Sequence, residues 1–295
     1  MTDYSYVQVE AALIETNLAV MRGMRDSLLQ LGIKKAHPYP SLAGVTDAFV
    51  HLPPDLVVVD IDMPDNEGIK IIRWLRSDPA FGNPFVAIIA TTWQPTETLL
   101  SRFNSSGADA LLIKPASPKQ LMDRVAALVE GRKLFVVTVD YTGPDRRKNP
   151  REGIQIPTLE PPNSLRLKAT GQWDRVAGRD QLAKGIAWLN NQKAERNAFQ
   201  IAFLINYALP GLARTPPDQR AYDHVLRVTA MIEDLLNRVA GRALPLRFNT
   251  ACKAVLTLVE RIRRTPGTTP PAADVTQLQE LSLAVLNMTT PNRQP

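Results

Sequence analysis

The chain has 295 residues, of which 44% are hydrophobic and 22% are charged, and Cys252 is its one cysteine. This composition is typical of a globular protein, and a single cysteine excludes an internal disulfide framework. The start of the chain lacks a basic segment followed by an apolar run, and the most apolar helical stretch, 198–213, is too short to span a bilayer, so we expect a cytoplasmic protein.

Apolar strands alternate with helical patterns up to about residue 130. Predicted strands cover 7–14, 34–37, 56–59, 85–90 and 110–113, and predicted helices cover 18–31, 45–52, 68–77, 96–105 and 117–129. Continuous apolar strands that alternate with helices indicate a parallel sheet covered on both faces. The first part of the chain is therefore predicted to be an α/β domain with a doubly wound, five-stranded parallel sheet.

The rest of the chain has a different pattern. A further strand is predicted at 134–141, and the polar, proline-containing stretch that follows predicts an extended linker, so the domains are expected at 1–133 and 179–295 with a linker at 134–178. Prolines separate four predicted helices, at 180–209, 218–240, 246–265 and 273–288. We interpret them as a separate helical bundle. Phe199, Phe203 and Tyr207 share one face of the first of these helices, and we expect this face in the core.

Polar side chains follow the predicted strands of the first domain. Glu15 ends the first strand, Asp60 the third, Thr92 the fourth and Lys114 the fifth. Because the carboxyl ends of parallel strands meet at one edge of a sheet, these side chains are expected in one crevice. Carboxylates there suit Mg²⁺, and an aspartate beside a hydroxyl and an ammonium suits phosphoryl transfer.

Four motifs in this order resemble the receiver (CheY-like) domain of bacterial two-component response regulators, over residues 5–130. They are the acidic end of the first strand and the stretches VVVDIDMPDNEG (57–68), ATTW (90–93) and GADALLIKP (107–115). The resemblance implies a flavodoxin-like fold and phosphorylation of Asp60 by a histidine kinase or phosphotransfer protein. It also implies phosphoryl contacts from Thr92 and Lys114, a cis peptide bond between Lys114 and Pro115, and Mg²⁺ held by Glu15, Asp60 and the backbone carbonyl of Asp62.

The sequence departs from the family pattern at two positions near this site. The family usually ends its first strand with two adjacent acids, whereas here Thr16 follows Glu15. A hydroxyl is a poorer Mg²⁺ ligand than a carboxylate, so weaker metal binding is expected. Trp93 stands directly after Thr92, where a small residue is usual, and its ring either restricts access to Asp60, binds a partner or simply packs at the loop.

The predicted function is signalling rather than enzymatic turnover. We expect a response regulator that is phosphorylated on Asp60 and signals through contacts of the helical domain, as a homodimer or with a partner protein. Residues 1–133 carry 13 basic and 15 acidic side chains and the rest carry 22 and 14, so the basic excess lies in the second part. This leaves a DNA-binding regulator as an alternative. Two more functions stay open, namely a receiver that signals without phosphorylation and a phosphorelay component that uses His224.

Overall fold

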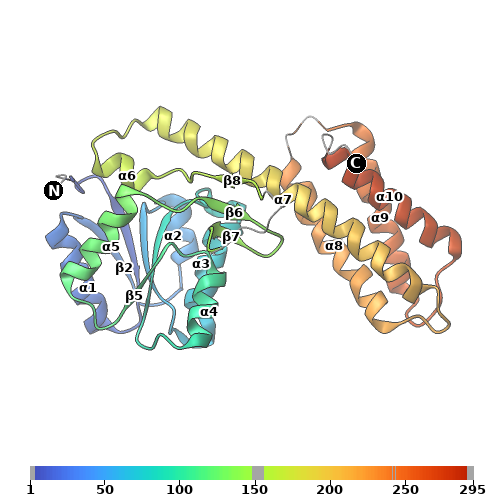
Figure 1. Cartoon of the computed structure of the whole chain (residues 1–295), viewed down its shortest axis with the longest axis horizontal. Coiled ribbons are helices and arrows are strands. Elements are labelled where there is room, and N and C mark those ends of the chain that lie inside the picture. Colours follow the sequence, from blue (N-terminus) through green and yellow to red (C-terminus); the bar gives the residue numbers. More distant parts are fainter. Residues whose placement is uncertain (1–3, 148–155, 241, 243, 291–295) are drawn as a thin grey trace. The chain divides into compact units, whose positions relative to one another are not determined.

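The computed structural model describes residues 4–147, 156–240, 242 and 244–290. Its first five strands are β1 (Glu10–Ile14), β2 (Lys35–Tyr39), β3 (Leu56–Asp60), β4 (Ala87–Thr92) and β5 (Ala110–Ile113). They form a parallel sheet in the order β2-β1-β3-β4-β5 (Figure 1). The five-stranded, doubly wound parallel sheet predicted from the alternating pattern is confirmed.

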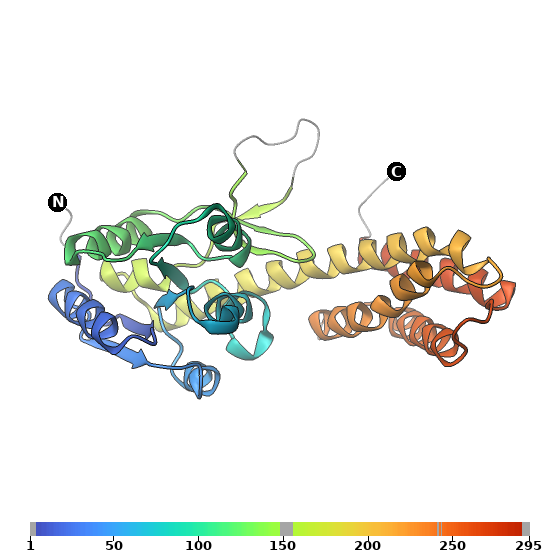
Figure 2. The same cartoon turned by 90° about the horizontal axis from the view of Figure 1, so that it is seen from below.

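Five helices cover the two faces of this sheet (Figure 2). Apolar residues of α1 (Leu18–Leu31) and α5 (Pro118–Glu130) pack on one face, and those of α2 (Val45–His51), α3 (Glu67–Ser77) and α4 (Glu97–Ser106) pack on the other. Short 3₁₀ turns, Pro64–Asn66 and Pro79–Phe81, lie before and after α3. Both faces are therefore buried, which explains why the central strands read as unbroken apolar runs.

The second strand shows how an edge position tolerates proline. The sequence predicts a weak strand at 34–37 that Pro38 disturbs, whereas the strand continues through Pro38 to Tyr39. β2 pairs only with β1, at the edge of the sheet. An edge strand can lack an N–H on its unpaired side without losing a hydrogen bond of the sheet, so the proline does not end it.

The segment predicted as an extended linker is ordered in its described residues. It contains a small antiparallel sheet in the order β7-β6-β8, made of β6 (Phe135–Val137), β7 (Thr142–Pro144) and β8 (Thr158–Leu159), and helix α6 (Ser164–Ala169). Leu165 and Ala169 of α6 join the core between the main sheet and α5. The linker was predicted from the polar and proline-rich composition of this segment, and that prediction overlooked the apolar residues that pack it against the parallel sheet.

A buried cluster of two arginines and one aspartate anchors the same segment. Asp109 accepts from Arg76 and from Arg132, each over 2.9 Å, and its side chain is 3% exposed. Both guanidinium groups also lie over the ring of Phe135 in β6, at 5.1 and 5.0 Å from its centroid. Burial lowers the pKa of the Arg76 guanidinium to about 10, and the charge of Asp109 partly offsets this effect.

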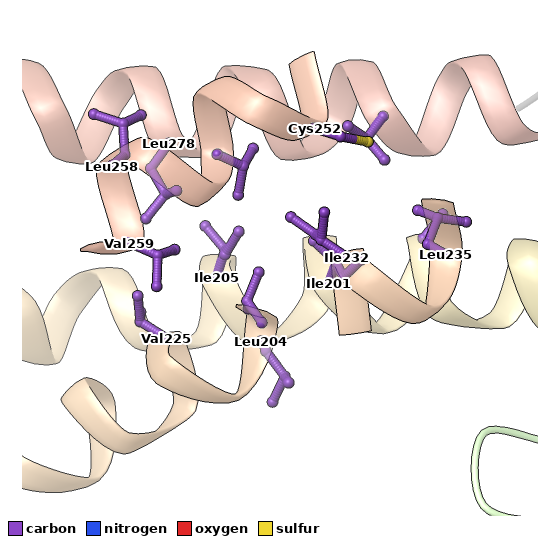
Figure 3. Close-up of a cluster of buried hydrophobic side chains, with 14 of the residues drawn as sticks. Ile201, Leu204, Ile205, Val225, Ile232, Leu235, Cys252, Leu258, Val259 and Leu278 are labelled. Atoms are coloured by element: carbon purple, nitrogen blue, oxygen red, sulfur yellow. The ribbon is translucent and has the colours of Figure 1, made fainter. Parts of the chain in front are cut away.

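The C-terminal helices form a core of their own. They are α7 (Arg175–Leu212), α8 (Gln219–Val239), α9 (Leu246–Arg264) and α10 (Ala272–Thr289). Side chains from all four helices meet in one apolar cluster, with Ile205, Val225, Val259 and Leu278 among its fully or nearly fully buried members (Figure 3). The predicted helical bundle is confirmed. α7 begins five residues earlier than predicted and continues through Pro210 in its last turn.

The aromatic stripe of α7, namely Phe199, Phe203 and Tyr207, is exposed, so its predicted place in the core is wrong. The three side chains are 50%, 52% and 66% exposed. Consecutive rings are nearly parallel, with interplanar angles of 14° and centroids 6.5 and 6.0 Å apart. The buried side of this part of α7 is made instead by the smaller residues Ala198, Ile201, Ile205 and Ala208.

The chain divides into two compact units, residues 1–186 and residues 187–295. The first unit holds the five-stranded sheet together with the segment predicted as a linker, and the second holds most of α7 with α8–α10. Their cores consist of separate sets of buried residues. Among the residues that the structure describes, no helix is both long and apolar enough to cross a membrane.

Candidate functional site

Asp60 lies at the carboxyl end of the central strand β3. All five residues of this strand are buried, and Asp60 is 5% exposed. The chain then turns sharply into α3, and a Cβ placed on Gly68 would lie 1.9 Å from the backbone oxygen of Asp60. Glycine at 68 therefore allows the first turn of α3 to pack directly against the backbone at the end of β3.

Lys114 connects Asp60 with Glu15. Its Nζ lies 2.9 Å from Oδ1 of Asp60 and 2.9 Å from Oε2 of Glu15. Glu15 directly follows β1 and Lys114 directly follows β5, and the two side chains are 4% and 1% exposed. Two buried carboxylates repel each other unless a cation lies between them, and here the ammonium of Lys114 has that role. The Lys114–Pro115 peptide bond is cis.

Thr92 and Asp62 form a second contact beside this cluster. The hydroxyl of the fully buried Thr92 donates to Oδ1 and Oδ2 of Asp62 over 2.9 and 3.1 Å. The backbone N–H of Trp93 donates to Oδ2 of Asp62 over 2.6 Å. Asp62 in turn donates its own N–H to Oδ1 of Asp60 over 3.0 Å. A hydrogen-bonded chain therefore runs from the end of β4 to the end of β3.

The five residues predicted for the site thus lie at one edge of the sheet. Lys114 contacts both Glu15 and Asp60, whereas Thr92 is linked to Asp60 through Asp62. The sequence reasoning missed the link between Trp93 and Lys114, whose Nζ lies 5.1 Å from the centroid of the indole ring. The order of the strands supplies the signal that would have found it, because both residues directly follow adjacent strands, β4 and β5.

The donor set fits Mg²⁺ incompletely. Carboxylate oxygens of Glu15 and Asp60 are hard ligands of the kind that Mg²⁺ prefers, and both contact the ammonium of Lys114. The carboxylate of Asp62 is instead engaged by Thr92 and Trp93, and the residue after Glu15 is the exposed Thr16. Within the described part of the chain, no three His, Cys, Asp or Glu side chains are grouped as a metal site. An ion here would need water and backbone carbonyl ligands besides the two carboxylates.

Comparison with known families and proteins identifies residues 11–126, a part of the first unit. Residues 11–126 match the family described as the response regulator receiver domain. The DNA-binding response regulator MtrA of Mycobacterium tuberculosis is 41% identical over 76 residues, which are 26% of this chain and 31% of MtrA. The polar-differentiation response regulator DivK of Brucella ovis is 25% identical over 114 residues, which are 38% of this chain and 89% of DivK. The match to MtrA spans about a third of that protein's length.

Solved structures of receivers are similar to about two fifths of the chain. The chemotaxis protein CheY4 of Vibrio cholerae is 15% identical, with a TM-score of 0.37 over 40% of this chain and 97% of CheY4. The receiver domain of the sensor histidine kinase PA1611 of Pseudomonas aeruginosa, with a magnesium ion coordinated in its active-site cleft, is 20% identical, with a TM-score of 0.36 over 39% and 93%.

The sheet order, the carboxylates at the sheet edge and the family match all lead to the same assignment of residues 11–126. The match covers the five strands of the parallel sheet from within β1 to within α5. The resemblance inferred from the four motifs is therefore confirmed. Residues 11–126 form a receiver domain of the two-component response regulator family, a family of signalling domains.

Proposed function

We propose that the chain is a response regulator whose receiver domain accepts a phosphoryl group on Asp60. The observation that carries this proposal is the different environment of the two carboxylate oxygens of Asp60. Oδ1 is held by Lys114 at 2.9 Å and by the backbone N–H of Asp62 at 3.0 Å. In the described residues, no hydrogen bond or ion pair engages Oδ2, which leaves this oxygen as the nucleophile.

The proposed step transfers the group from a phosphohistidine of a kinase or phosphotransfer protein. Oδ2 of Asp60 attacks phosphorus, the new bond is an acyl phosphate, and the bond from phosphorus to the histidine nitrogen breaks. The ring of the phosphohistidine carries a proton on its other nitrogen, so the ring keeps the electron pair of that bond and the histidine leaves as neutral imidazole. Lys114 stays beside the acceptor and offsets the charge of the phosphoryl oxygens. Thr92 supplies a hydroxyl at the same edge once it exchanges its bond to Asp62.

Glu15 and Asp60 would hold Mg²⁺ through their carboxylates, with the backbone carbonyl of Asp62 as a further ligand. When bound, the ion supplies positive charge that neutralises the phosphoryl oxygens. Because Thr16 contributes no carboxylate, we expect a weaker Mg²⁺ site than one with two adjacent acids. Lys114 shares the two carboxylates with any bound ion, which lowers the affinity further.

The test is phosphorylation of the full chain by acetyl phosphate with Mg²⁺, read by intact mass. We expect a mass increase of one phosphoryl group in the wild type and none in Asp60→Asn. Asp65→Asn is the matched control, because Asp65 is exposed in the loop after β3 and engages neither Lys114 nor Thr92. An unmodified wild type, under conditions that label an ordinary receiver, would instead support a receiver that signals without phosphorylation.

For the second unit we propose self-association through the aromatic stripe of α7. The face around Phe199, Phe203 and Tyr207 also carries Gln200 and Asn206 but no charged residue between positions 199 and 207. It can therefore meet a copy of itself in antiparallel orientation without like-charge repulsion. Exposed aromatic rings are enriched in protein interfaces, and three of them in a row exceed the scattered apolar residues of an ordinary surface.

Light scattering of the full chain tests whether it self-associates through this stripe. We expect a dimer in the wild type and a monomer in Phe203→Ser. Val176→Ser is a control, because Val176 is a 77% exposed apolar residue of α7 in the first unit. A wild-type monomer, or dimers in both variants, would exclude the stripe as the interface. The DNA-binding alternative predicts instead salt-dependent retention of the chain on duplex DNA.

The phosphorelay alternative rests on His224 of α8. Its ring lies edge-on to Tyr207, with centroids 5.5 Å apart, and its Nδ1 is buried without a hydrogen-bond partner in the described residues. This alternative predicts that His224→Gln abolishes phosphoryl transfer from Asp60. The proposal above predicts no change in the half-life of phosphorylated Asp60.

A further inference from the structure

A cavity of about 410 Å³ lies at the end of the main sheet opposite to Asp60. Its walls are the segments before β3 and β4, helix α6 and the first two turns of α7, all within the first unit. Asp55 directly precedes β3 and lines this cavity, whereas Asp60 ends the same strand. Five residues of extended chain separate the two sites by about 16 Å. The cavity is therefore distinct from the phosphorylation site.

The charges around the cavity do not balance. Lys168 binds Oδ2 of Asp55 over 2.7 Å, and the same oxygen accepts the backbone N–H of Glu10 over 2.9 Å. That pair is neutral as a whole. Arg175 and Arg179 also line the cavity, one helical turn apart on α7. Both are exposed, and in the part of the chain that the structure describes neither has an ion pair or a hydrogen bond, so the cavity lining carries an excess of two positive charges.

The rest of the wall is held in place by internal contacts. Trp173 lies against Lys168, whose Nζ is 5.1 Å from the ring centroid, and against Gly178, where an added Cβ would come within 2.6 Å of the indole. Asn163 donates to the carbonyl of Leu128 over 2.8 Å and caps α6. The wall around the arginines is thus preformed, and a ligand would need to order only the two arginine side chains.

We propose that this cavity binds a small phosphomonoester. A phosphomonoester is close to a dianion at neutral pH, which matches the two unpaired guanidinium groups, and planar guanidinium forks bind phosphate oxygens in pairs. The volume is in the range of pockets that hold small organic ligands. The side chains of Gln181 and Ser164 line the same cavity and offer hydrogen bonds to the organic part of such a ligand.

Isothermal titration of the full chain with AMP and with ribose 5-phosphate tests the proposal. We expect at least one of them to bind and the uncharged partners, adenosine and ribose, not to bind. Arg179→Gln should weaken binding roughly tenfold or more, because it removes a charge-assisted hydrogen bond. Lys184→Gln is the matched control: it removes one positive charge from the same helix at a residue that pairs with Asp180 and lies outside the cavity.

Asp60→Asn is a second control, because it changes the opposite end of the sheet and should leave the affinity for the phosphomonoester within twofold. The proposal is overturned if neither phosphomonoester binds at millimolar concentration, or if adenosine binds as tightly as AMP. It is also overturned if Arg179→Gln and Lys184→Gln weaken binding equally, which would indicate general attraction to a basic surface. Failure of the phosphorylation test at Asp60 would not affect any of these outcomes.

Discussion

Single side chains decide the charge balance of the receiver domain. At the carboxyl edge of the sheet, Glu15 and Asp60 share the ammonium of Lys114, and Thr16 adds no further negative charge. Directly before β5, Asp109 is the carboxylate shared by the buried guanidinium groups of Arg76 and Arg132. Substitutions at Thr16 and Asp109 therefore have expected effects on Mg²⁺ affinity and on the free energy of unfolding.

Thr16→Asp should tighten Mg²⁺ binding by about tenfold, because it adds a carboxylate next to Glu15. The measurement is a Mg²⁺ titration followed by Trp fluorescence, since Trp93 lies over Lys114 at the same edge. The asparagine of Thr16→Asn has nearly the same shape as aspartate but no charge, so this variant should change the Mg²⁺ affinity little. Equal affinities for the two variants would contradict the assignment of this edge as a metal site.

Asp109→Asn should lower the free energy of unfolding by about 3–5 kcal/mol, because it leaves two buried guanidinium groups without their shared counter-charge. Asp123→Asn is the control, since it breaks an exposed ion pair with Lys119. The side chains of Asp123 and Lys119 are 62% and 82% exposed. The control should cost less than about 1 kcal/mol. Denaturant titration measures both, and similar losses in the two variants would refute the importance of the buried cluster.

At the scale of elements, the turn from β3 into α3 sets the position of the backbone around Asp60. Gly68 permits the close approach of the helix to the end of the strand, and the backbone oxygen of Asp60 occupies the space that a side chain would need. Gly23, by contrast, lies inside α1 with no heavy atom within 4 Å of an added Cβ. The two glycines therefore have opposite expected effects.

Gly68→Ala should destabilise the protein by about 1–3 kcal/mol and slow the phosphorylation of Asp60, because α3 must move away from the acceptor. Gly23→Ala should stabilise it by about 0.5–1 kcal/mol, since alanine favours the helix and nothing opposes its methyl group. Thermal unfolding and the rate of labelling by acetyl phosphate measure the two effects. A neutral Gly68→Ala substitution would show that the close approach does not constrain the site.

For the whole molecule, the separate cores predict that the two units lose structure independently. Cys252 reports on the second unit, where it is fully buried in the helical core, and burial raises the pKa of its thiol to about 11. The thiol is therefore protonated and unreactive at pH 8 in the folded chain. As the pH rises above 9, the unfolded chain ionises this thiol first, so the stability of the second unit should fall between pH 9 and 11.

Thiol labelling at increasing denaturant concentration tests the independence of the units. Asp109→Asn should shift the unfolding of the first unit to a lower denaturant concentration. The NMR signals of apolar side chains in the core of this unit follow that transition. The concentration at which Cys252 becomes reactive should stay the same. A parallel shift of both transitions would show that the units unfold as one cooperative body.

The sequence by itself determined the class of the fold and which polar side chains meet at one edge of the sheet. Apolar strands that alternate with helices place polar strand ends at one edge, and this rule brought Glu15, Asp60 and Lys114 together without coordinates. It also predicted the helical bundle, because the spacing of apolar residues in α8 follows the helical period. Such patterns are local or follow from topology, so predictions made from them do not depend on contacts between distant parts of the chain.

Only the tertiary structure decided which surfaces are covered. A polar, proline-rich stretch became part of the first unit because Phe135, Leu165 and the buried arginines dock it, and these contacts join residues far apart in the chain. The aromatic stripe of α7 was expected in the core but is exposed, because periodicity identifies an apolar face without saying what packs on it. The partners of Lys114, and the cavity beside Arg179, likewise depend on distances that no one-dimensional pattern contains.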